Sequence, residues 1–177
     1  MRSVVLIPTY NEIDSLPSAL DRVRSAAVQA HILVIDDNSP DGTGDLADAR
    51  AQDDDHIHVL HRTEKNGLGP AYLAGFKWAL ENDFELIIEM DADGSHRAED
   101  LALLIQRAEM ADKPDLVIGS RWISGGATQG WSQKRVLLSR AGNVYINLAL
   151  GLNVRDATAG FRVYRADLLR RMDLNKV

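Results

Sequence analysis

The sequence predicts an α/β fold with a largely parallel sheet, and two observations carry this prediction. Short runs rich in valine and isoleucine recur along the chain, and longer stretches of helical periodicity separate them. Such alternation is typical of β-α-β units, in which a helix connects two parallel strands. The runs are almost continuously apolar, as expected where helices cover both faces of the sheet.

The elements follow one another in a regular order. We expect strands at 4–7, 32–35, 57–60, 86–90 and 116–118, with helices at 14–29, 42–52, 69–81 and 98–110. A helix at 134–150, a short strand at 161–164 and a helix at 166–171 follow. Pro70 suits the first turn of its helix, and Asp41 or Thr43 can cap the helix at 42–52.

Length and composition limit the classes of protein. The chain has 177 residues, of which 45% are hydrophobic and 26% charged, as is ordinary for one globular domain. Twenty basic residues against 26 acidic ones give a formal net charge of −6, which disfavours a nucleic-acid binder. The chain has no cysteine, which excludes disulfides and thiolate nucleophiles. Because it also has no long apolar run and no signal-peptide pattern, we expect a cytoplasmic chain without a transmembrane segment.

Polar residues follow four of the expected strands at their carboxyl ends. In open α/β sheets, ligands bind beyond these ends. The four segments are 8–12, 36–39, 91–93 and 119–121. A solvated loop would explain any one segment, but it explains poorly why pairs of aspartates gather there. We therefore expect one ligand site at this edge of the sheet.

The two aspartate pairs allow different interpretations. Asp91 and Asp93 repel each other unless a proton or a cation intervenes, and a hard ion such as Mg²⁺ or Mn²⁺ shared with substrate phosphates would relieve that repulsion. The alternative is a solvated turn at Asp93. Asp36 and Asp37 fit a second metal site, a nucleoside-binding site or a capped turn.

Three further features bear on the ligand site. There is no Gly-x-Gly-x-x-Gly after the first strand and no Walker A sequence, which disfavours a dinucleotide dehydrogenase. Arg121 stands at a strand end, and arginine forks suit phosphate oxygens. Trp122 and Trp131 flank a glycine-rich loop, where they fit lid anchors, acceptor contacts or ordinary core residues.

Six motifs occur in order along nearly the whole chain: 7–12, 34–43, 66–69, 90–96, 119–121 and 156–162. Together they resemble those of the family 2 glycosyltransferases with the GT-A fold. The stretches 39–43, 91–96 and 130–135 resemble more narrowly the polyprenol- or dolichol-phosphate mannosyltransferases. The resemblance implies that residues 1–177 form a single α/β/α catalytic domain of the GT-A (nucleotide-diphospho-sugar transferase) fold. It also implies that this domain lacks the C-terminal acceptor-side elements of longer relatives.

The resemblance assigns roles to individual positions. The donor nucleotide sugar is matched by Pro8, Tyr10, Glu12, Ile35, Asp37, Asp91, Ala92, Asp93 and Arg121. The metal ligands are matched by Asp91 and Asp93, with Ser95 where some relatives have a metal-binding glutamine. The acceptor phosphate is matched by Arg121, Arg135 and Ser139, and the catalytic positions by Asp93, Arg121 and Arg135. Asp156 is expected to orient groups near the acceptor rather than to act as a base.

The implied activity is metal-dependent, inverting transfer of mannose from GDP-mannose to a polyprenyl (dolichyl-type) monophosphate, giving polyprenyl phosphate β-mannose and GDP. The acceptor is already anionic, so no strong general base is needed. Such a chain would act as a peripheral protein at the cytoplasmic face of a membrane, alone or with a membrane-protein partner. The alternatives are transfer of another sugar, such as glucose from UDP-glucose, a non-catalytic nucleotide-sugar-binding module, and a metal-dependent nucleotidyltransferase.

Overall fold

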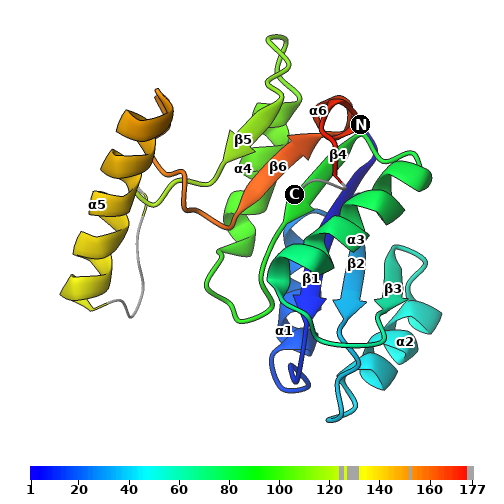
Figure 1. Cartoon of the computed structure of the whole chain (residues 1–177). Coiled ribbons are helices and arrows are strands. Elements are labelled where there is room, and N and C mark those ends of the chain that lie inside the picture. The colour runs from blue at the N-terminus through cyan, green and yellow to red at the C-terminus, as the bar shows by residue number, and fades with distance from the viewer. Residues whose placement is uncertain (124–125, 127–131, 152, 175–177) are drawn as a thin grey trace.

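The computed structural model describes residues 1–123, 126, 132–151 and 153–174, and the expected α/β architecture is confirmed (Figure 1). The strands are β1 (Ser3–Thr9), β2 (His31–Asp36), β3 (Ile57–His61), β4 (Leu86–Glu89), β5 (Leu116–Ile118) and β6 (Arg162–Arg165). The helices are α1 (Leu16–Ala26), α2 (Thr43–Asp53), α3 (Leu68–Glu81), α4 (Ala98–Ala108), α5 (Gln133–Leu150) and α6 (Ala166–Arg171). The first helix is shorter than predicted: Pro17 stands in its first turn, and its C-terminal residue Ala26 is followed by a turn in which Ala30 N–H donates to the Ala27 carbonyl.

The described strands form one sheet in the order β3-β2-β1-β4-β6-β5. Strands β3, β2, β1 and β4 are parallel, and β6 runs antiparallel to both β4 and β5. Thr9 lies opposite Asp36, and Leu6 lies opposite Glu89, so the chain leaves β1, β2 and β4 at the same edge. The mainly parallel sheet is thus confirmed, and its parallel half brings three of the four polar segments together.

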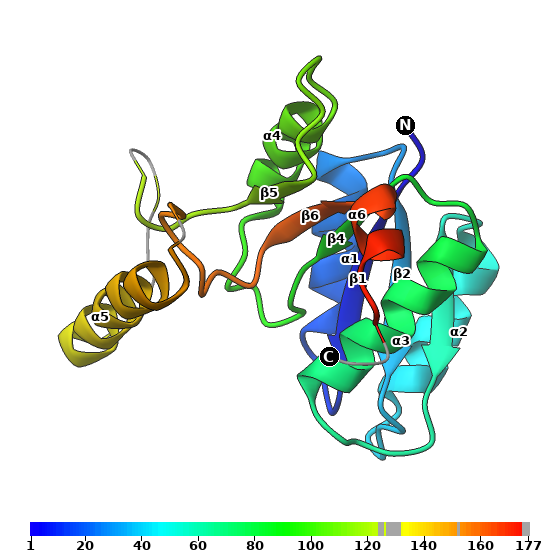
Figure 2. The ribbon, with the colours of Figure 1, turned by 45° about the horizontal axis from the view of Figure 1, so that its top comes forward.

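Helices cover both faces of the sheet, as the continuously apolar strands predict (Figure 2). Alternate residues of β1 point to opposite faces: Val5 and Ile7 pack with α1, α2 and α4, whereas Val4 and Leu6 pack with α3 and α6. All four side chains are fully buried. A strand with two buried faces cannot slip in register without exposing apolar groups, so this core fixes where the strand ends lie.

Gly75 of α3 lies against the sheet closely enough to leave no room for a side chain. A Cβ there would stand 2.6 Å from Cδ1 of Ile35 and 2.9 Å from Cδ1 of Leu6. We expect Gly75→Ala to lower the free energy of unfolding by about 1–3 kcal/mol, because both side chains are buried and must shift. Urea denaturation measures the change. Gly69→Ala, in the same helix with no atom within 4 Å of its added Cβ, is the control and should leave stability equal or slightly higher.

Helix α5 differs from the other helices because many of its exposed residues are large and apolar. It stands apart from the sheet in both ribbon views. Leu137, Leu138, Tyr145 and Leu148 are each at least 70% exposed, and Asn143 is the buried residue of the helix. These leucines and the tyrosine fall on one side of the helix, at the spacing of one helical face. Among the described residues, no helix is both long and apolar enough to span a membrane.

Candidate active site

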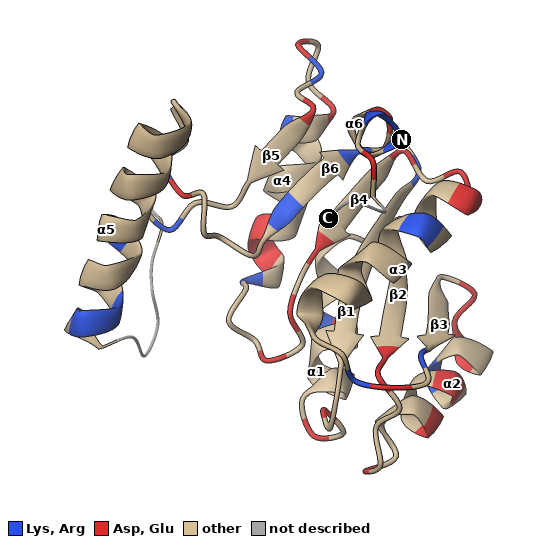
Figure 3. Cartoon of the chain, viewed as in Figure 1, with Lys and Arg blue, Asp and Glu red and all other residues tan. Residues whose placement is uncertain are grey.

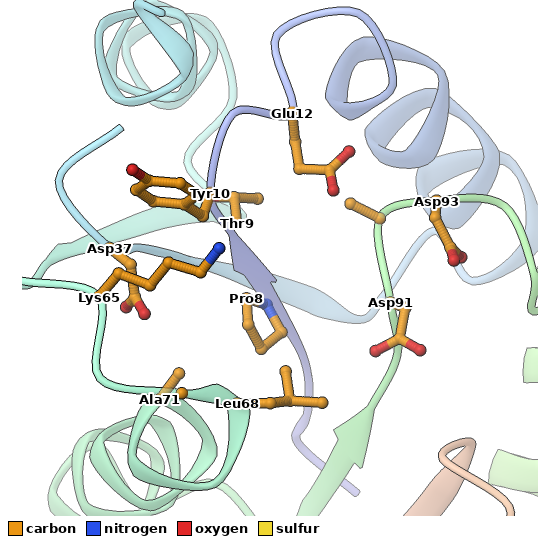
Figure 4. A pocket seen from close by; sticks show the side chains of 12 residues that line it. Pro8, Thr9, Tyr10, Glu12, Asp37, Lys65, Leu68, Ala71, Asp91 and Asp93 are labelled. Atoms are coloured by element: carbon orange, nitrogen blue, oxygen red, sulfur yellow. The ribbon is translucent and has the colours of Figure 1, made fainter. Parts of the chain in front are cut away.

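The chain segments that follow β1, β2 and β4 enclose a cavity of about 290 Å³ together with the start of α3 (Figure 4). Its lining residues are Pro8, Thr9, Tyr10, Glu12, Asp37, Lys65, Gly67, Leu68, Ala71, Asp91, Ala92 and Asp93. Seven of the nine residues predicted for the nucleotide sugar are therefore neighbours in space. The two that do not line the cavity are Ile35, which is fully buried in the core, and Arg121.

The structure gives Asp36 and Asp37 different surroundings. The sequence allows a second metal site, a nucleoside-binding site or a capped turn for this pair. Asp36 is buried and accepts hydrogen bonds from the Ser39 hydroxyl at 2.6 Å and the Ser39 N–H at 3.1 Å, so it fixes the turn after β2. Asp37 instead lines the cavity, where Arg62 Nη1 donates to its Oδ1 at 2.7 Å. Burial raises the pKa of Asp37, while Arg62 opposes that rise.

Lys65 lines the same end of the cavity and was not found from the sequence. Its ammonium lies 3.9 Å from the centroid of the Tyr10 ring, within the range of a cation–π contact. It immediately precedes the glycine-containing motif at 66–69, and this position is the feature of the sequence that could have indicated it. In Figure 4, Tyr10, Asp37 and Lys65 gather at one end of the cavity and Asp91 and Asp93 at the other.

Neighbouring groups orient both carboxylates at the other end of the cavity. The Tyr72 hydroxyl donates to Asp91 Oδ1 at 3.2 Å, and the Ser95 N–H donates to Asp93 Oδ1 at 2.8 Å. Partial desolvation favours a higher pKa for Asp93, but the hydrogen bonds from Ser95 and the nearby positive charges together hold the pKa below its usual value. Burial lowers the pKa of His96 against the pull of both aspartates, so the ring is neutral and its Nδ1 accepts the Asp91 N–H at 3.1 Å.

The donor set of Asp91 and Asp93 fits a hard divalent cation that the protein holds only in part. In the described part of the chain, no group of three or more histidine, aspartate or glutamate side chains is arranged around one metal position. Two carboxylates at an open cavity suit Mg²⁺ or Mn²⁺, which complete their shells with water and substrate phosphate oxygens. Ser95, the third position predicted to hold the metal, donates its backbone N–H to Asp93 and does not line the cavity.

We expect Tyr72→Phe to weaken metal binding without unfolding the protein. The substitution keeps the ring in the core but removes the hydroxyl that donates to Asp91. Loss of a supporting hydrogen bond of this kind costs about 10- to 100-fold in metal affinity. A titration of Mn²⁺ binding in the presence of GDP measures the shift. Tyr145→Phe, which removes an exposed hydroxyl on α5, should leave the titration unchanged.

Arg121 belongs to a second polar cluster between β5, α5 and the segment that leads to β6. Its Nε and Nη2 donate to the two oxygens of Asp156 at 2.8 and 2.7 Å, and its backbone N–H donates to the same carboxylate at 3.0 Å. Arg121 Nη2 also donates to the Thr158 hydroxyl at 2.8 Å, which lies 3.3 Å from the hydroxyl of Ser139. The structure thus places two of the three predicted acceptor residues, Arg121 and Ser139, in one cluster, and Asp156 orients the arginine.

Arg135 lies in the first turn of α5, which is basic in Figure 3. Its backbone N–H donates to Oγ of Ser132, the N-cap of that helix, at 3.3 Å. The charge of Arg135 contributes to the lowered pKa of Asp93, and the charge of Arg121 contributes to the lowered pKa of His96. The charges of both arginines therefore act on groups at the carboxylate end of the cavity. Trp131 and most of the glycine-rich loop before α5 lie outside the described residues.

A family model, "Glycosyl transferase family 2", matches residues 4–173. The chain belongs to this family. It is 53% identical over 177 residues to a protein of Micrococcus luteus named "Undecaprenyl-phosphate mannosyltransferase", covering 100% of this chain and 72% of that one. It is 49% identical over 177 residues to the "Polyprenol monophosphomannose synthase" of Mycolicibacterium smegmatis, covering 99% of this chain and 66% of the relative. This glycosyltransferase chain thus spans only part of the length of both relatives.

Solved structures of glycosyltransferases share the fold. The mannosyltransferase PcManGT from Pyrobaculum calidifontis, solved with GDP-Man and Mn²⁺, superposes with a TM-score of 0.66 at 20% identity, over 97% of this chain and 46% of that one. S. aureus TarS 1–349 superposes with a TM-score of 0.60 at 16% identity, over 96% of this chain and 48% of that one. At these sequence identities the structural similarity shows a shared fold and nothing about function. With the family match, it confirms the GT-A fold that the sequence motifs predict.

Proposed function

We propose that this glycosyltransferase transfers mannose from GDP-mannose to a polyprenyl monophosphate, giving polyprenyl phosphate β-mannose and GDP, with Mg²⁺ or Mn²⁺ bound. The observation that carries the proposal is one cavity with Tyr10, Asp37 and Lys65 at one end and two carboxylates, Asp91 and Asp93, at the other. The names of the two relatives, one an undecaprenyl-phosphate mannosyltransferase and one a polyprenol monophosphomannose synthase, support the sugar and the acceptor class.

The donor would lie along the cavity. Tyr10, Pro8 and Asp37 would hold the nucleoside, and the diphosphate would reach the end where Asp91 and Asp93 stand. A divalent cation held by these two carboxylates would neutralise charge on the diphosphate as GDP departs. Ser95 and Tyr72 fix the two carboxylates by hydrogen bonds, so their spacing is set before the donor arrives. Preorganised groups of this kind stabilise developing charge without reorganising during the reaction.

The acceptor would approach from the side of α5. Arg121, held by Asp156, would position the acceptor phosphate with Arg135 and Ser139 for attack on the anomeric carbon of mannose, opposite to the departing GDP. The phosphate oxygen is the nucleophile and carries no proton at neutral pH, so no side chain has to accept one. The exposed apolar face of α5 suits the prenyl chain or the bilayer surface that holds it.

The deciding experiment offers the protein radiolabelled GDP-mannose, undecaprenyl phosphate and Mn²⁺ or Mg²⁺, and then extracts the lipids. Label in the organic phase with equimolar release of GDP supports the proposal. A parallel reaction with UDP-glucose tests the alternative donor. Binding of GDP-mannose without transfer favours a nucleotide-sugar-binding module, and pyrophosphate among the products favours a nucleotidyltransferase.

Sedimentation with and without undecaprenyl-phosphate vesicles tests the peripheral membrane association.

A further inference from the structure

Among the described residues that line the cavity, Lys65 is the one basic residue, and it lies at the end proposed for the nucleoside. Its ammonium points into the cavity between Tyr10 and Pro8 (Figure 4). It sits 3.9 Å from the Tyr10 ring centroid and near enough to Asp37 for its charge to act on that carboxylate. A positively charged hydrogen-bond donor and a negatively charged hydrogen-bond acceptor are therefore neighbours at the end of the cavity proposed for the nucleobase.

Arg62 holds the acceptor of this pair in place. Its Nη1 donates to Asp37 Oδ1 at 2.7 Å, and the side chains of both residues are at most 13% exposed. A carboxylate oxygen accepts more than one hydrogen bond, so Asp37 remains able to accept from a ligand. The lysine is held more loosely, by a cation–π contact and a flexible stem, so its ammonium can adjust to a bound base.

The nucleobases differ in the order of hydrogen-bond donors and acceptors along their edges, and Lys65 with Asp37 can distinguish these orders. Guanine presents one acceptor, O6, followed by two donors, N1–H and the 2-amino group. Adenine presents a 6-amino donor where guanine has O6, and an unprotonated N1. Uracil presents an acceptor and one donor, followed by a second acceptor that a carboxylate would repel. An ammonium followed by a carboxylate therefore complements guanine best, and lysine to O6 is a common contact with guanine where proteins bind DNA.

We propose that Lys65 and Asp37 together select guanine, with Lys65 donating to O6 and Asp37 accepting from N1–H and the 2-amino group. This inference rests on the proposed function, in which the donor is GDP-mannose. Lys65 is then a specificity-determining residue of the donor site. The competing assignment places its ammonium on the diphosphate, where it would strengthen binding of every nucleotide alike.

Equilibrium binding of GDP, IDP, ADP and UDP, with Mn²⁺ present, separates the two assignments. IDP keeps O6 and N1–H but lacks the 2-amino group, and ADP lacks O6. We expect Lys65→Met to lower the affinity for GDP and for IDP by roughly ten-fold or more and to change the affinity for ADP by no more than about two-fold. The ratio of the GDP affinity to the IDP affinity should not change. Lys65→Arg should keep the preference for GDP over ADP. Lys77→Met, the same change at an exposed position of α3, should bind all four nucleotides as the wild type does.

Each contrary result identifies what fails. Equal weakening of all four nucleotides by Lys65→Met would overturn the guanine assignment in favour of a phosphate contact. Wild-type preference for GDP that Lys65→Met leaves intact would also overturn it, while the proposed donor stands. A wild type that prefers UDP or ADP would contradict the proposed donor and the selection of guanine with it. A melting curve for each variant confirms that only folded protein is compared.

Discussion

Asp93→Asn should lower mannosyl transfer on the order of a thousand-fold. The substitution keeps a side-chain oxygen to accept the Ser95 N–H but removes the charge that, with Asp91, would hold the divalent cation. Lewis-acid stabilisation by a bound metal is worth several kcal/mol of transition-state charge, and about 4 kcal/mol corresponds to that loss in rate. Transfer of labelled mannose into extracted lipid, at saturating GDP-mannose and a series of Mn²⁺ concentrations, measures the effect.

The metal titration distinguishes a lost cation from a lost fold. The Asp93 variant should show neither the activity nor the Mn²⁺ dependence of the wild type, yet it should melt at nearly the same temperature because the residue is exposed. Asp45→Asn, at an exposed position of α2, is the matched control and should behave as the wild type. Full activity in the Asp93 variant would contradict both the metal role and the assignment of the cavity.

Much of the fold can be predicted from the sequence because its signals are local. The runs that become β1, β2 and β4 are almost continuously apolar, as is typical of parallel strands that are buried on both faces. The direction of β6 carries no such signal. Arg162–Arg165 are two apolar or aromatic residues between two arginines, and only their pairing with Glu89–Leu86 shows that the strand runs antiparallel. That pairing joins segments more than 70 residues apart.

The residues of the site also divide into those whose positions the sequence predicts and those whose positions it does not. Asp37, Asp91 and Asp93 stand directly after strands, so the parallel topology alone predicts that they meet. The partners that orient them come from elsewhere: Tyr72 from the middle of α3, and Arg62 from the segment between β3 and α3. Arg121 follows β5, as the sequence predicts. Its bond to Asp156 could not be predicted, since it depends on how the segment after α5 returns to the sheet.

Asp156→Ala should destabilise the protein by about 3–5 kcal/mol, because it leaves a largely buried guanidinium without its carboxylate. The Asp156 side chain is fully buried, and the side chain of Arg121 is 20% exposed. Urea denaturation at pH 7 measures the loss. Asp112→Ala breaks a two-point pair with Arg107 that has similar distances, 2.9 and 2.8 Å, but lies at the surface. That control should change stability little, since exposed pairs are solvated and screened. Equal effects of the two substitutions would contradict the distinction.

The contribution of Asp156 should depend on pH in one direction. Burial favours a higher pKa for Asp156, but the hydrogen bonds and charge of Arg121, with a hydrogen bond from Thr158, together hold the pKa below its usual value. The unfolded chain therefore takes up a proton at this residue before the folded protein does. The stabilisation is complete above the ordinary aspartate range, near pH 4, and is lost as the pH falls further. The difference in unfolding free energy between wild type and Asp156→Ala should accordingly shrink below about pH 4.

A double variant separates the two consequences of this ion pair. Replacing both partners, as Arg121→Met with Asp156→Leu, removes the unpaired charge and should recover part of the stability that Asp156→Ala loses. The remainder stays lost because the Arg121 backbone N–H also donates to Asp156. It should not recover mannosyl transfer, because the guanidinium that positions the acceptor phosphate is gone. GDP binding should stay close to that of the wild type, since neither residue lines the cavity. Restored transfer in the double variant would show that Arg121 serves only to hold the segment after α5 against the sheet.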